Sequence, residues 1–273
     1  MKLYQIVIVA IIGFVLLRSC TCSSNNMAEY EKSPVDDIIR DLNNVKPFEI
    51  VLYDMDADDG MTSNTFRHKY KVITNDPSGT PSEKITDWKE VSESFFAANQ
   101  DNMGMTIASK DSTGKLSKTP SPAGYANYVG NPKYGQWTQQ NGSSFWEFYG
   151  KYAMLQSVLG MVSGPSIFRN NYSDYRSSWG NGRAYYGPSS GGRSWYGTRG
   201  SATSNTYKNS TWSSKPASFR DDVRSRVSRS SSSRSRVGSS GTWGSSSSRS
   251  SSRSGSRFSS SSSSRSRGGG SGK

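Results

Sequence analysis

The chain is poor in the side chains that perform most metal and nucleophile chemistry. Its 273 residues include one histidine, His68, and two cysteines, Cys20 and Cys22. These are too few ligands for a Cys/His metal site and too few cysteines for a disulfide-framed fold. A bond between cysteines separated by one residue would also close a strained ring. The sequence therefore predicts no cofactor, no metal ion and a protein that is not an enzyme.

Hydrophobic residues are also scarce. They make up 32% of the chain, against about 45–50% in globular proteins, so part of the chain has no core. Serine supplies 26 of the 50 residues at 224–273, and we expect this Ser/Arg/Gly-rich tail to be disordered. Residues 164–223 scatter Tyr and Trp among Gly, Ser and Asn, which predicts a low-complexity linker.

The positive charge is concentrated in this tail. The net charge is +13, and residues 224–273 hold ten Arg and one Lys with no acidic residue. We expect the tail to bind a polyanion, an anionic lipid or a cell-wall polymer, through its Ser-Arg dipeptides. The arginines concerned are Arg224, Arg226, Arg234, Arg236, Arg265 and Arg267.

These dipeptides resemble the arginine-serine domains of RNA-processing proteins, so nucleic-acid binding through the tail is an alternative hypothesis. No RNA-recognition pattern precedes the tail, and export would remove the chain from RNA. Nucleic acid is therefore the less favoured partner.

The long hydrophobic run lies at the N-terminus, over Leu3–Leu17 between Lys2 and Arg18. As a helix it would reach about 22 Å, short of a ~30 Å hydrocarbon core but typical of a signal peptide. The following Leu17-Arg18-Ser19-Cys20 resembles a bacterial lipobox, which implies lipidation of Cys20, although Arg18 departs from that motif. Either a lipid on Cys20 or the uncleaved run would attach the chain to a membrane, with its domain on the exported side. Residues 1–22 are therefore predicted to be an anchor, and 23–32 a spacer.

The middle of the chain, 33–163, predicts one small α+β domain with a short antiparallel sheet and about three helices. Capping patterns and apolar spacing indicate helices over 34–43, 87–98 and 144–159. Aromatic and β-branched runs indicate strands over 48–55, 66–74 and 103–109.

A glycine- and proline-rich loop at 118–140 carries four aromatic residues, Tyr125, Tyr128, Tyr134 and Trp137. Two interpretations are open: a lid that buries these rings over the core, or a surface for a protein or glycan partner. The lid is favoured because aromatic side chains are more often buried.

Four acidic residues, Asp54, Asp56, Asp58 and Asp59, follow the first strand. We expect a solvated hairpin loop, with weak divalent-cation binding as a second interpretation. The strand followed by Asp-x-Asp also resembles the first motif of haloacid dehalogenase-like phosphatases. That resemblance implies Asp54 as nucleophile and Asp56 as acid/base in a cation-dependent enzyme, but Asp58 replaces the usual Thr or Val.

Residues 187–191 match the G-x-S-x-G pattern of a nucleophile elbow, centred on Ser189. The one imidazole base is His68, and its neighbours Arg67 and Lys69 predict a position on the solvent face of a strand. No helix is expected after Ser189, so this pair does not predict a hydrolase.

The segment 103–159, with Pro122-Ala123-Gly124-Tyr125 and Tyr134-Gly135-Gln136-Trp137, resembles lipoprotein-like bacterial envelope proteins that end in Ser/Gly/Arg-rich tails. The resemblance implies an envelope location and carries no activity. The leading hypothesis is a non-enzymatic, membrane-tethered envelope protein that binds a partner or a polyanionic surface.

Overall fold

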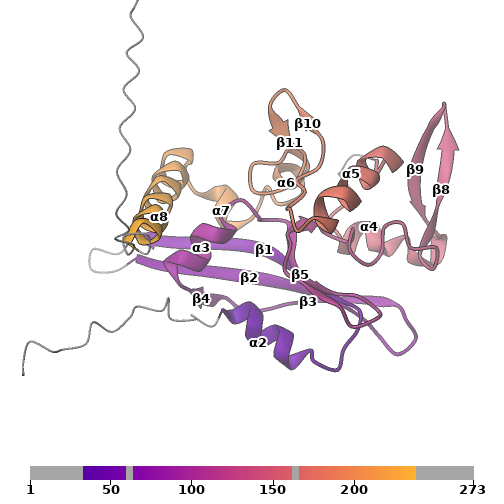
Figure 1. Cartoon of the computed structure of the whole chain (residues 1–273), viewed down its shortest axis with the longest axis horizontal. Coiled ribbons are helices and arrows are strands. Elements are labelled where there is room, and N and C mark those ends of the chain that lie inside the picture. The colour runs from indigo at the N-terminus through magenta and orange to yellow at the C-terminus, as the bar shows by residue number, and fades with distance from the viewer. Residues whose placement is uncertain (1–32, 60–63, 162–165, 238–273) are drawn as a thin grey trace, which may run out of the picture.

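The computed structural model describes residues 33–59, 64–161 and 166–237, without the side chains of Asp59, Gln140 and residues 230–237. Within these residues the chain forms an α+β fold with a seven-stranded antiparallel sheet and seven α-helices (Figure 1). The α+β class and the antiparallel sheet are confirmed. The sheet is larger and the helices are more numerous than expected.

The sheet is built around a long hairpin of β1 (Phe48–Asp59) and β2 (Asn64–Asn75). Its strand order is β3-β2-β1-β5-β6, with β4 also paired to β2 and β7 to β5. The strands predicted over 48–55 and 66–74 lie within β1 and β2, and the one predicted over 103–109 begins two residues late, as β5. The remaining strands are β3 (Pro81–Ile85), β4 (Lys89–Val91), β5 (Met105–Lys110), β6 (Leu116–Ser117) and β7 (Ser121–Pro122).

Strand β1 supplies side chains to two separate cores. Ile50 and Leu52 belong to the first hydrophobic cluster and Val51 to the second, as expected for neighbours on opposite faces of a strand. A register shift after Leu52 resets the alternation, so that Met55 also joins the first cluster. The central strand is therefore buried on both faces.

The first cluster contains residues of α2 (Pro34–Asp41), α3 (Glu93–Asn99), α7 (Thr211–Ser214) and α8 (Ala217–Val237). The predicted helix at 34–43 is confirmed as α2, which begins with Ser33 as N-cap and Asp36 in a reciprocal capping box.

The helix predicted from Asp87 begins six residues later. Residues Lys89–Val91 form strand β4, which pairs with β2, and α3 begins after Ser92. The Ser92 hydroxyl accepts a hydrogen bond from the backbone N–H of Phe95 at 3.1 Å. Pairing along the sheet edge therefore outweighed the capping pattern at Asp87 and Glu90.

The helix predicted over 144–159 is wrong in its first part. Residues Ser143–Phe148 form strand β9, which pairs with β8 (Gly135–Gln140) across a turn at Asn141 and Gly142. Both turn residues have positive φ, 52° and 76°, as a two-residue hairpin turn requires. A short 3₁₀ turn η1 (Gly150–Tyr152) and helix α4 (Met154–Val158) follow.

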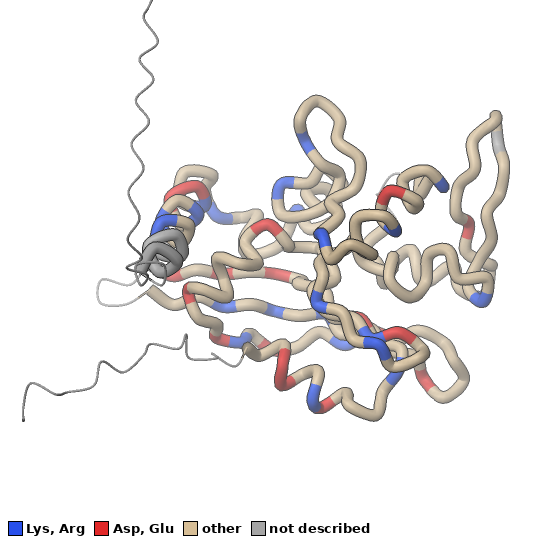
Figure 2. Tube along the Cα trace, in the orientation of Figure 1, with Lys and Arg blue, Asp and Glu red and all other residues tan. Residues whose placement is uncertain are grey.

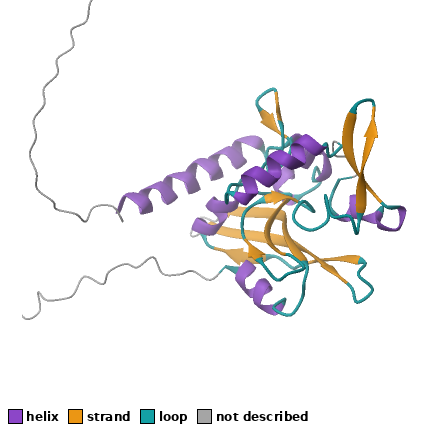
Figure 3. Ribbon diagram, turned by 45° about the vertical axis from the view of Figure 1, so that its right-hand side comes forward, coloured by secondary structure: helices purple, strands orange, loops and turns teal. Residues whose placement is uncertain are grey.

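The segment predicted to be a linker is folded where the structure describes it. It contains α5 (Arg169–Gly180), the small hairpin β10 (Ser189–Ser190) and β11 (Arg193–Ser194), and α6 (Ser201–Thr206). Helix α8 includes the first residues of the predicted tail, so the expectation of disorder from residue 224 is wrong over 224–229. Figure 3 shows α8 extending away from the sheet. Residues 238–273 lie outside the described part of the chain.

The predicted anchor over 1–22, the spacer over 23–32 and the lipidation site Cys20 also lie outside the described residues. Among the helices that the structure does describe, none is at once long and apolar enough to cross a bilayer.

Candidate functional site

The acidic residues after the first strand do not form the expected loop, because β1 continues through all four. Asp54 is buried, and it accepts backbone hydrogen bonds from Thr211 at 2.7 Å, Trp212 at 3.2 Å and Met55 at 2.8 Å. Two of these donors are the first N–H groups of α7. Asp54 therefore fastens the C-terminal segment to the sheet, as a helix cap does.

Asp56 is held by two cations, at 2.9 Å from Arg67 and 3.1 Å from Lys215. Asp58 is exposed, and the side chain of Asp59 is not described. No group of three or more His, Cys, Asp or Glu side chains in the described ranges is placed to hold a metal ion. The carboxylates of Asp54 and Asp56 are thus bonded to other groups of the chain itself.

His68 lies inside the protein, and its predicted position on a solvent face is wrong. Its ring is fully buried, with centroids 5.8 Å from Phe95 and 5.3 Å from Phe96, and Nδ1 lies 3.2 Å from the Tyr70 hydroxyl. Burial lowers the pKa of His68 to about 3, so the imidazole is neutral. Ser189 lies in the exposed hairpin strand β10, without the strand–turn–helix of a nucleophile elbow.

The aromatic loop is mostly a lid. Tyr125, Tyr128 and Tyr134 are buried in the second hydrophobic cluster, which excludes these three from an interaction surface in the described fold. Asn75 joins two of them, since it accepts from the Tyr128 hydroxyl at 3.2 Å and donates to that of Tyr134 at 2.8 Å. Trp137 is half-buried against Trp146, with ring centroids 5.2 Å apart.

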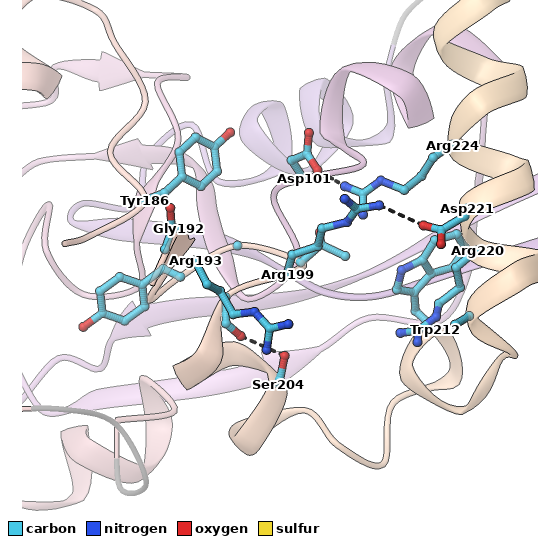
Figure 4. Close-up of a pocket in the computed structure, with 16 residues that line it drawn as sticks. Asp101, Tyr186, Gly192, Arg193, Arg199, Ser204, Trp212, Arg220, Asp221 and Arg224 are labelled. Atoms are coloured by element: carbon cyan, nitrogen blue, oxygen red, sulfur yellow. Dashed lines mark hydrogen bonds and ion pairs between the residues drawn. The ribbon is translucent and has the colours of Figure 1, made fainter. Parts of the chain in front are cut away.

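A cavity of about 720 Å³ opens between α8 and the β10–β11 hairpin (Figure 4). We call it the arginine-lined cavity, because four arginines and two aspartates are its charged residues. They are Arg193, Arg199, Arg220, Arg224, Asp101 and Asp221. Figure 2 shows basic residues on both α8 and the hairpin.

The floor of this cavity is the loop at 197–200. Thr198 fixes it to the turn after α3, donating its N–H to the Asp101 carbonyl at 3.0 Å and its hydroxyl to the Gln100 carbonyl at 2.7 Å. Gly197 has a φ of +85°, and a Cβ there would lie 2.6 Å from the Asp101 carbonyl oxygen. Only glycine fits this position.

The two walls are attached to the core independently. Val223 and Val227 anchor α8 in the first hydrophobic cluster. On the hairpin side, Tyr196 donates its N–H to the carbonyl of Tyr186 at 3.0 Å, and the Tyr186 hydroxyl donates to Asn102 at 2.8 Å. The charged side chains therefore project from supports that packing has already fixed.

The charges in the cavity are not balanced. Arg224 forms an ion pair with Asp101, and Arg199 forms one with Asp221 at 2.8 Å. Arg224 is partly buried, which lowers its pKa from the usual value. Arg193 and Arg220 have no side-chain partner among the described residues, so the cavity carries two uncompensated positive charges.

Of the arginines predicted to bind polyanions, Arg224 alone lines this cavity. Arg226 donates to the Asn64 side chain at 3.3 Å on β2. Arg234 and Arg236 belong to α8, with side chains that are not described, and Arg265 and Arg267 lie beyond the described residues. Sequence reasoning missed Arg193, Arg199 and Arg220. The local signal was a concentration of arginine at 193–199, next to glycines that were interpreted as linker.

Comparison of the chain with protein-family models, curated proteins and solved structures gives no match. The interpretation of the cavity therefore rests on its own residues.

Proposed function

We propose that the chain is a non-enzymatic, membrane-tethered envelope protein whose folded domain binds an anionic partner in the arginine-lined cavity. The observation that carries the proposal is that Arg193 and Arg220 lie on opposite sides of the cavity and have no side-chain partner within the described ranges. Arginine is suited to this role because its planar guanidinium forms paired hydrogen bonds with carboxylate or phosphate.

The size and construction of the cavity support a binding site. Its volume of about 720 Å³ falls within the ~300–1,000 Å³ range of small-molecule sites. The floor loop and both walls are fixed by hydrogen bonds and core packing, so little order has to be gained on binding.

The positions of the candidate catalytic groups support a role without chemistry. His68 is buried and neutral, and Asp54 accepts backbone hydrogen bonds with both carboxylate oxygens. In this geometry neither group faces the arginine-lined cavity.

The membrane tether is proposed from the apolar run at Leu3–Leu17 and from Cys20. Cell fractionation with a labelled fatty-acid analogue tests it. Label on the wild-type chain and its loss in Cys20→Ser would support a lipid anchor, while membrane association without label would support a retained helix. A soluble, unlabelled chain would contradict the tether.

Anion binding is tested by titrating the full chain with tripolyphosphate. Arg193→Gln and Arg220→Gln should each weaken binding about tenfold, since each removes a charge-assisted contact. The control is Arg183→Gln, because Arg183 is exposed, lies outside the cavity lining and carries the same charge. All three variants change the net charge equally, so attraction to the basic tail is matched. Equal affinities across the three variants would contradict the proposal.

A further inference from the structure

We infer that the ligand of the arginine-lined cavity carries at least two phosphate-type groups and bridges α8 to the β10–β11 hairpin. This inference rests on the proposed function, and it specifies the class of ligand. A short phosphate chain and a phosphodiester polymer without bases both have this chemistry.

The arginines approach the cavity from separate supports. Arg193 projects from the hairpin side and Arg199 from the floor loop (Figure 4). Arg220 and Arg224 are four residues apart on α8, so they share one face of that helix. A ligand that engages the arginines of both walls must therefore span the cavity.

The volume and charge of the cavity favour a ligand with more than one anionic group. A space of about 720 Å³ is large for one five-atom oxyanion, which would contact one wall and leave the other arginine unpaired. The four arginines exceed the two aspartates by two charges. Two anionic groups would balance that excess.

An existing contact already joins the two sides. Arg199 of the floor loop pairs with Asp221 of α8 at 2.8 Å, and the two side chains are 68% and 64% exposed. Such exposed ion pairs contribute little to stability, so an incoming phosphate can replace Asp221 at low cost. The phosphate would then take the place of Asp221 as the partner of Arg199.

The rings around the cavity favour phosphate over nucleic acid. Binding of single strands relies on exposed aromatic faces on which bases stack. Trp212 is 1% exposed, and Tyr196 packs edge-on against Tyr125. The third ring, Tyr186, is half-buried, and its hydroxyl donates to Asn102 at 2.8 Å. Four arginines beside two half-buried tyrosine rings favour a ligand held by its phosphates over one held by stacked bases.

The test measures the dissociation constants of inorganic phosphate and of tripolyphosphate for the full chain by calorimetry. The quantity compared is the constant for phosphate divided by the constant for tripolyphosphate. Bridging predicts a ratio of about a hundred or more in the wild type. Arg193→Gln and Arg220→Gln should each reduce this ratio about tenfold, while Arg183→Gln leaves it unchanged. These side chains have no partners in the described fold, so both wall variants should fold normally.

The outcomes separate the inference from the proposed function. If phosphate binds as tightly as tripolyphosphate, or if the ratio survives loss of either wall arginine, bridging is wrong while an anion site stands. If the wall variants and Arg183→Gln bind each anion with the same affinity, both the bridging ligand and the anion site are wrong. Tighter binding of single-stranded DNA than of polyphosphate with equal charge would replace the phosphate ligand with nucleic acid.

Discussion

At the scale of single residues, two buried titratable groups have pKa values shifted far from their ordinary values, in opposite directions. Glu49 is fully buried and accepts hydrogen bonds from Thr106 at 2.6 Å, Gly124 at 2.8 Å and Asn127 at 3.1 Å. Loss of solvation outweighs these bonds and raises the pKa of Glu49 from 4.5 to about 7. For His68, burial lowers the pKa from 6.5 to about 3.

The two shifts act in opposite directions between pH 4.5 and 6.5. Within this interval the folded chain holds a proton on Glu49 that the unfolded chain lacks, so a lower pH favours folding through Glu49. The unfolded chain holds a proton on His68 that the folded chain lacks, so a lower pH favours unfolding through His68. The pKa values of Asp76 and Asp111 are lowered from 3.8, so these groups take up protons below this interval. The contributions of Glu49 and His68 to the pH dependence of stability should therefore cancel in the wild type.

Substitution of one of these two groups should reveal the pH dependence of stability that the other contributes. Each full unit of pH changes the free energy of unfolding by about 1.4 kcal/mol for one uncompensated proton. Glu49→Gln should therefore lose about 3 kcal/mol of stability between pH 6.5 and 4.5, while His68→Phe should gain a similar amount. Denaturant unfolding at the two pH values measures this. Parallel pH profiles for the wild type and both variants would show that these groups titrate normally.

At the scale of elements, α8 shows that the first part of the basic C-terminal region supports the fold. Val227 is fully buried, and Arg224 pairs with Asp101, although a sequence so rich in serine and arginine predicts disorder. Val223 and Val227, at helical spacing, are buried in the first hydrophobic cluster, and Phe219 of the same helix packs against it. Composition averaged over 50 residues concealed this local signal.

Two truncations distinguish the contribution of residues 224–237 to stability from that of residues 238–273. A chain ending at Val223 loses the buried Val227 side chain and the Arg224 ion pair. Its free energy of unfolding should fall by about 2 kcal/mol or more. A chain ending at Val237 keeps both contacts and should retain the wild-type melting temperature. Equal melting temperatures for the two truncations would show that α8 adds nothing to the core.

The β8–β9 hairpin illustrates which element signals can be read from sequence. Ser144 and Glu147 have capping-box spacing, but Glu147 accepts a cross-strand hydrogen bond from the Thr138 hydroxyl at 2.8 Å. The decisive signal was Asn141-Gly142, which suits a tight hairpin turn, followed by aromatic residues that favour strands. Capping patterns of two residues occur by chance in serine-rich sequences, whereas positive φ at two successive positions requires particular residues.

Trp137 tests whether this hairpin belongs to the core. Its ring lies 5.2 Å from that of Trp146 and 5.5 Å from that of Tyr172, and Arg169 lies over its face. Trp137→Ala should lower the free energy of unfolding by about 2 kcal/mol, less than for a fully buried ring because Trp137 is half-buried. Gln139→Ala provides a control on the same strand, because Gln139 is exposed. Unchanged stability with loss of partner capture would instead assign Trp137 to a surface.

At the scale of the whole molecule, the arginine-lined cavity depends on contacts that a single sequence does not display. Its floor is fixed by Thr198 to residues almost a hundred positions earlier in the chain, and its two walls lie on different elements. The helix α2 and the central strands were predictable because their periodicity is local. The site was not, since the arginines become neighbours only after Asp54 fastens α7 and the valines of α8 enter the core.

The central claim is that this cavity, and not the tail alone, binds the anionic partner, and hydrogen exchange of the full chain tests it most directly. Peptides covering 193–200 and 217–224 should exchange more slowly when tripolyphosphate is added, because a bridging ligand restrains both walls. Arg220→Gln should abolish that protection and Arg183→Gln should preserve it. Protection confined to 238–273, with no change at either wall, would contradict the account.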